Sequence, residues 1–125
     1  MTYVWVIPAV APSYNVHIRM HWSKQERARC AFIDAAWPLL YERGNACPRP
    51  LKTPVVMHAV VSRTTVRRRD SDNASMPLYK WINDLLVCRG FLPDDTHDLV
   101  TNMPPRLVVG EREETVVLIE EAMGL

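Results

Sequence analysis

Hydrophobic runs with strand-like character recur along this 125-residue chain. Tyr3–Ile7 is aromatic and β-branched, which is typical of a short strand. Val55–Val61 is apolar on both faces, which predicts a central strand covered from both sides. Thr115–Ile119 predicts a final strand, and we expect it to pair with a strand at Leu107–Val109 across the turn at Gly110–Glu114.

Two other segments have the features of helices. Ser23–Glu26 is a capping-box sequence, so we expect a helix to begin there and to break near Trp37, where a proline follows. A second helix should contain Pro77 in its first turn and end at Gly90. Its expected buried stripe is Leu78, Trp81, Ile82, Leu85 and Leu86. Its other side should carry Lys80, Asn83, Asp84 and Val87. Ala11–Trp22 has no clear periodicity and is expected to be a polar, partly basic loop.

The order β-α-β-α-β-β predicts an α/β (α+β) fold with a small mixed sheet of about four strands and two main helices packed on it. A chain of 125 residues with 48% hydrophobic content suffices for one core, so we expect a single domain over residues 1–125. No apolar run approaches the ~20 residues that cross a bilayer, and the three cysteines show no pairing pattern. The sequence therefore predicts a cytoplasmic protein with no membrane partner.

Charge is the feature that points to chemistry. Basic and acidic residues nearly balance, at 15 and 14, so a nucleic-acid role requires local segregation of charge. That segregation occurs where a run of arginines precedes Asp70 and Asp72, whose side chains would point the same way in an extended segment. Asp94 and Asp95 add two carboxylates after the second helix. Carboxylates are natural Mg²⁺ ligands and arginines bind phosphates, so the pattern indicates a metal-dependent nuclease. Taken singly, each acidic pair could instead serve only as turn or cap residues.

Basic and aromatic residues outside the acids are candidate DNA contacts. The basic candidates are Arg19, Lys24, Arg63, Arg67, Arg68 and Arg69. The three consecutive arginines could also simply offset the acids beside them. Trp22 and Tyr14 are candidates for stacking on unpaired bases. His17 and His21 have zinc-like spacing but no further ligand nearby, so we expect DNA contact or loop packing. His58, within an apolar strand, is expected to be a core histidine.

The sequence RRRDSDN, followed by Lys80, Asp84 and GFLPDD, resembles the RusA family of Holliday-junction resolvases. Ala11–Asn15 also resembles that family's Pro-Pro-Ser-x-Asn segment, and the similarity extends over almost the whole chain. The resemblance implies a RusA-like fold and a catalytic Mg²⁺, for which Mn²⁺ could substitute. The residues that it assigns are Asp70, Asp72 and Asp95 as ligands, Asp94 as a supporting acid, Lys80 as a basic catalytic group, and Asn73 and Asp84 as supporting partners.

The resemblance has one departure, because Ala74–Pro77 looks like a four-residue insertion of about one helical turn before Lys80. Lys80 could keep its role, or form only a surface pair with Asp84. The expected function is Mg²⁺-dependent resolution of four-way junctions by paired symmetric nicks, in DNA recombination and repair. A twofold-symmetric substrate favours a homodimer, and the family implies a bacterial or phage-infected cell. The alternatives are a non-catalytic branched-DNA-binding module and an interaction protein whose acids only cap helices.

Overall fold

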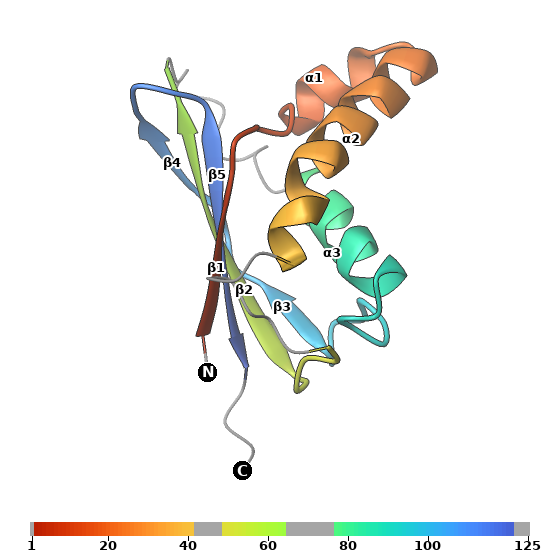
Figure 1. The fold of residues 1–125 in the computed structure, drawn as a ribbon. Helices are drawn as coiled ribbons and strands as arrows, with labels where there is room; N and C mark the ends of the chain where they lie inside the picture. Colours follow the sequence, from red (N-terminus) through yellow and green to blue (C-terminus); the bar gives the residue numbers. More distant parts are fainter. Residues whose placement is uncertain (1, 42–48, 65–76, 122–125) are drawn as a thin grey trace.

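The computed structural model describes residues 2–41, 49–64 and 77–121, with only the backbone described at residues 14 and 15 (Figure 1). Its elements are β1 (Thr2–Ile7), α1 (Tyr14–Arg19), α2 (Trp22–Ala36), the 3-10 helix η1 (Trp37–Tyr41), β2 (Val55–Arg63), α3 (Leu78–Cys88), β3 (Val100–Asn102), β4 (Arg106–Val109) and β5 (Glu114–Glu121). The predicted class, a mixed sheet with helices packed on it, is confirmed. The described sheet has five strands, one more than expected.

Strand β2 lies at the centre of the sheet, as predicted. The strand order is β1-β5-β2-β3. Strand β4 also pairs with β2, further along that strand than the part that pairs with β3. Strand β2 is antiparallel to β5 but parallel to both β3 and β4. The predicted hairpin between β4 and β5 is wrong, because β2 separates them. The eight-residue β5 pairs along its length with β2 and β1, which satisfies more backbone groups than the four-residue β4 could.

The core lies between one face of the sheet and the helices, which all stand on the same side in Figure 1. Along β2, burial alternates between fully buried Val55, Met57, Ala59 and Val61 and half-buried residues of the opposite face. The prediction that β2 is covered from both sides is therefore wrong for the described residues. Its valines on the open face reflect β-propensity, since a branched side chain suits a half-covered pleated surface.

Helix α2 begins at Trp22, so its N-cap lies two residues before the predicted Ser23. Its N-cap is His21, whose Nδ1 accepts a hydrogen bond from the Ser23 N–H at 3.2 Å. The capping box is therefore wrong, and Glu26 pairs with Arg29 instead of returning to the cap. A histidine ring nitrogen can accept this bond as a hydroxyl would, but histidine is not among the residues that signal a cap in a sequence.

The ends of α1 and α2 follow from short-range constraints. The α-helical part of α2 ends at Ala36 and continues as η1, so the predicted break before Pro38 is confirmed. The segment expected to be a loop contains α1, so that expectation is wrong. Six residues are too few to establish a periodicity, and Val16 and Ile18 on this helix are both exposed.

Helix α3 packs as its pattern predicts and ends as expected. All five residues of the predicted stripe are buried. Gly90 has a φ of +82°, and the next residue, Phe91, donates its N–H to the Leu86 carbonyl at 2.8 Å. Asn83 departs from prediction because it is buried, and its Nδ2 donates to Asn102 Oδ1 of β3 at 3.3 Å. The buried face of α3 is therefore wider than the stripe of hydrophobic residues, because it includes this polar side chain.

Candidate functional site

Several members of the predicted metal site lie outside the described residues. They are Asp70, Asp72, Asn73, Arg67, Arg68, Arg69 and the inserted Ala74–Met76. The chain is described up to Thr64, just beyond β2, and again from Pro77, at the N-terminus of α3. The structure therefore places Lys80, Asp84, Asp94 and Asp95 but leaves the Asp-x-Asp prediction untested.

Lys80 lies in the first turn of α3 and is exposed, with 60% of its side-chain surface accessible. Its Nζ lies 3.6 Å from Oδ2 of Asp84, one helical turn further on. This is the surface pair that the sequence allowed, and such exposed pairs contribute only a few tenths of a kcal/mol. Because the pair is long and open to solvent, the Lys80 ammonium stays available to an anionic ligand.

Asp94 and Asp95 are exposed in the connection from α3 to β3. The Asp95 N–H donates to Asp94 Oδ1 at 2.7 Å, which holds this turn together. Asp98 follows in the same connection, and its pKa is lowered chiefly by the hydrogen bond that it accepts from the side chain of Thr96. Three exposed carboxylates thus fall within five residues.

The described members of the predicted site form two groups, the Lys80–Asp84 pair on α3 and the Asp94–Asp95 turn after it. Lys80 lies in the first turn of α3, whereas Asp94 and Asp95 lie in the connection beyond its end. The eight residue-to-residue steps from Lys80 to Cys88 span roughly 12 Å of helix axis. Within residues 2–41, 49–64 and 77–121, no three His, Cys, Asp or Glu side chains form a group that could hold a metal ion.

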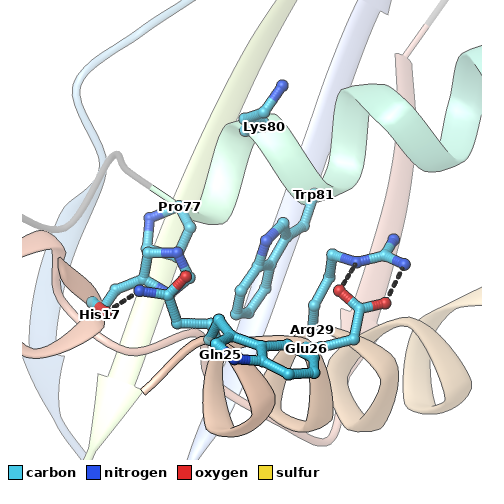
Figure 2. A pocket seen from close by; sticks show the side chains of 8 residues that line it. His17, Gln25, Glu26, Arg29, Pro77, Lys80 and Trp81 are labelled. Atoms are coloured by element: carbon cyan, nitrogen blue, oxygen red, sulfur yellow. Dashed lines mark hydrogen bonds and ion pairs between the residues drawn. The ribbon is translucent and has the colours of Figure 1, made fainter. Parts of the chain in front are cut away.

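Lys80 does line a pocket of about 460 Å³ that the sequence did not reveal. The pocket, here called the α2–α3 pocket, lies between the first turns of these helices and the end of α1 (Figure 2). Its lining residues are His17, Trp22, Gln25, Glu26, Arg29, Pro77, Lys80 and Trp81. Three sequence candidates, His17, Trp22 and Lys80, therefore share one site. The spacing of residues 22, 25, 26 and 29 would have placed them on one helical face, but nothing in the sequence shows that α3 faces them.

The walls of the α2–α3 pocket are fixed by contacts among its own residues. The Gln25 Nε2 donates to the carbonyls of His17, at 2.9 Å, and Met20, at 3.2 Å. Trp81 is 3% exposed, and its ring meets the His17 ring edge-on with centroids 5.6 Å apart. Trp81 also contacts Phe32 in the core, and the centroids of these two rings are 5.7 Å apart. The pocket is therefore a rigid extension of the core surface.

The charges in the pocket largely cancel. Arg29 donates to both carboxylate oxygens of Glu26, at 2.7 and 3.2 Å (Figure 2). This bond lowers the pKa of Glu26 and raises the pKa of Arg29, so both groups stay charged. Neither α2 nor α3 has an acidic residue in its first turn, so the partial positive charge of each helix N-terminus is not offset there. The pocket is slightly electropositive around an aromatic surface.

The remaining candidates have mixed outcomes. Arg63 donates from Nη2 to the Ala11 carbonyl at 2.7 Å, so it ties the end of β2 to the segment after β1. Arg19 and Lys24 are exposed on α1 and α2. The expectation that His58 is a core residue is wrong, because it lies on the open face of the sheet, where its Nε2 is 3.5 Å from Glu120 Oε2.

Comparison with known proteins adds no identification: no protein-family model matches the sequence, and a search of curated proteins finds no match. Among the helices of the described segments, none combines the length and apolar character needed to span a bilayer. What the protein does must therefore be argued from its own residues.

Proposed function

We propose that this protein is a Mg²⁺-dependent endodeoxyribonuclease that resolves Holliday junctions and other branched DNA by paired symmetric nicks. The observation that carries the proposal is the RusA-like series of arginines, acids and lysine from Arg67 to Asp95. It is supported by two features of the described residues: Lys80 presents an exposed ammonium, and Asp94 and Asp95 are open to solvent.

The donor set suits a hard divalent cation. Asp94 uses Oδ1 to accept the Asp95 N–H, which leaves its Oδ2 and both oxygens of Asp95 for other partners. Mg²⁺ favours such carboxylate oxygens, and when bound between acids and a phosphodiester it would activate water and neutralise phosphate oxygens. The proposed ligands are Asp70, Asp72 and Asp95, with Asp94 in support.

Lys80 would supply the remaining electrostatic contribution. An ammonium near the scissile phosphate stabilises the negative charge that accumulates as the leaving alkoxide forms. Its weak pair with Asp84 can open at little cost, because both side chains are solvated. Cutting two strands of a twofold-symmetric junction requires two such centres, so we propose that the protein acts as a C₂ homodimer.

The test is cleavage of a synthetic four-way junction with and without Mg²⁺. The parent protein should make paired symmetric nicks only with the metal. Asp95→Asn should abolish cleavage yet bind the junction as tightly or more tightly, because it removes one negative charge facing the phosphates. The matched control is Asp34→Asn, an exposed acid on α2 that should leave the rate unchanged. Cleavage by Asp95→Asn at the parental rate would exclude Asp95 as a ligand.

Two observations favour a second candidate, a branched-DNA-binding module that does not cut. Lys80 already has a partner in Asp84, and the described acids do not gather into a metal group. Such a module would bind four-way junctions in preference to linear duplex. It would release no nicked product with Mg²⁺, Mn²⁺ or any other divalent ion, which separates the two functions in the same assay.

A further inference from the structure

We infer that the α2–α3 pocket binds one unpaired nucleotide of branched DNA, with the base stacked on the Trp22 indole and the phosphate near Lys80. This inference rests on the proposed function, because that function makes DNA the ligand. It adds which part of the DNA enters the protein, a nucleotide outside a base pair, and which residues receive it.

Trp22 is the main observation. It is the first residue of α2, and 73% of its surface is exposed, which makes it the most exposed large hydrophobic residue described. Its ring lies 5.5 Å from the His21 ring at 37°, and His21 is itself held as the N-cap of α2. An indole presented in this way is a stacking platform, because the flat face of any nucleobase can cover it.

The pocket beside Trp22 has a suitable size and is already formed. Its volume of about 460 Å³ falls within the roughly 300–1,000 Å³ of typical small-ligand sites. Gln25 is fixed by two hydrogen bonds, and Trp81 and Pro77 are buried. A ligand therefore does not have to order these walls, and a preformed site loses less entropy on binding.

Polar groups in the pocket suit a nucleotide better than an apolar ligand. Glu26 is neutralised by Arg29, so it does not repel a phosphate strongly. Lys80 then contributes an exposed ammonium from the α3 side of the pocket, and Figure 2 shows its side chain directed away from Trp81.

Because the charges in the pocket nearly cancel, stacking on Trp22 should decide which form of DNA the pocket prefers. Duplex DNA offers phosphates but keeps its bases stacked within the helix, so it cannot use Trp22. A single strand, or the unpaired nucleotides at an opened junction, can use both the ring and the ammonium. Stacking should then supply most of the affinity and charge a smaller part.

The experiment measures binding in EDTA, so that cleavage does not interfere. The protein is titrated with a single-stranded oligothymidylate and with a duplex of the same length, and tryptophan fluorescence is followed. Trp5 and Trp81 are buried and Trp37 is half-buried, so stacking on the far more exposed Trp22 should contribute most of any quenching. We expect quenching by the single strand and tighter binding of it than of the duplex.

Variants separate stacking from charge. Trp22→Ala should weaken single-strand binding by about 5- to 100-fold with no change in salt dependence, and Trp22→Phe should retain most of the affinity. Lys80→Ala should reduce the slope of log K against log salt by about 0.7, whereas Lys52→Ala, a distant exposed lysine, should not. Equal single-strand affinity of the parent and Trp22→Ala would overturn the inference, as would an unchanged slope in Lys80→Ala for the phosphate contact.

This inference and the proposed function fail separately. If junctions are never nicked but single-strand binding depends on Trp22, the pocket stands and the nuclease assignment falls. If junctions are nicked with Mg²⁺ but Trp22→Ala binds and cuts like the parent, the nuclease stands and the pocket assignment falls. Circular dichroism of each variant checks that its fold is retained.

Discussion

Tyr79 combines a core position with a titratable group. It lies in the first turn of α3, is 4% exposed, and its hydroxyl donates to the Met103 carbonyl just after β3. Burial raises the pKa of Tyr79 to about 12. The reason is that the phenolate would lose its hydration inside the core, so the folded protein keeps the phenol neutral at a pH where the unfolded chain ionises.

This difference predicts the behaviour at high pH. Between about pH 10 and about pH 12 the unfolded chain gives up the Tyr79 proton first, so the free energy of unfolding falls as pH rises, by about 1.4 kcal/mol per unit. Tyr79→Phe should lose about 1 kcal/mol near neutral pH through the missing hydrogen bond, but fall less steeply above pH 10. Urea unfolding across this range measures both effects, and parallel curves for the two proteins would contradict the assignment.

At the scale of elements, α3 is the part that sequence determines most completely. Its stripe of large hydrophobic residues and Gly90 define a face and an end that agree with the structure, whereas Pro77, expected in the first turn, is the N-cap residue. Gly90 matters because of its φ of +82°, a conformation that costs an L-residue energy. A Cβ there would lie 3.6 Å from Arg49 Cδ, an ordinary contact, so space is not the constraint.

Replacing Gly90 should therefore reveal backbone strain alone. Gly90→Ala should destabilise the protein by about 1 kcal/mol, since alanine is disfavoured at positive φ. Gly90→Asn should cost less, because asparagine tolerates this region better. Chemical denaturation of the two variants beside the parent provides the comparison. Alanine proving as stable as glycine would show that the turn after α3 relaxes to negative φ.

The elements that sequence did not predict fail for identifiable reasons. The cap of α2 is a histidine, and α1 is too short to show a period. The pairing of β4 with β2 depends on tertiary competition among strands rather than on the turn at Gly110. The α2–α3 pocket joins His17, Gln25 and Lys80, which only the packed fold brings together. Lys80 and Trp22 could still be named as candidates from the sequence. Each offers a charged or aromatic side chain whose chemistry does not depend on residues far away in the chain.

At the scale of the whole molecule, Glu121 connects three parts of the chain. It lies at the end of β5, and its Oε2 accepts the Lys52 N–H at 2.6 Å, in the segment before β2. Its Oε1 accepts the Tyr3 hydroxyl of β1 at 2.8 Å. The Lys52 bond is the main cause of a lowered pKa for Glu121. One carboxylate thus fastens the sheet near both termini of the described chain.

The lowered pKa of Glu121 predicts the direction of acid destabilisation. A carboxylate with a lower pKa in the folded state stabilises above its ordinary pKa of 4.5, and this stabilisation is lost as pH falls through the lowered folded value. Glu121→Gln should therefore lower the free energy of unfolding at neutral pH, by no more than about 1 kcal/mol because solvent screens the site. Below pH 4.5 the difference from the parent should shrink.

Glu113→Gln, an exposed acid in the turn before β5, is the matched control and should keep the parental acid transition. Thermal unfolding of the three proteins from neutral pH to below pH 4.5 makes the comparison. A gap between Glu121→Gln and the parent that stays constant with pH would mean that the Lys52 and Tyr3 bonds do not depend on the charge of this carboxylate.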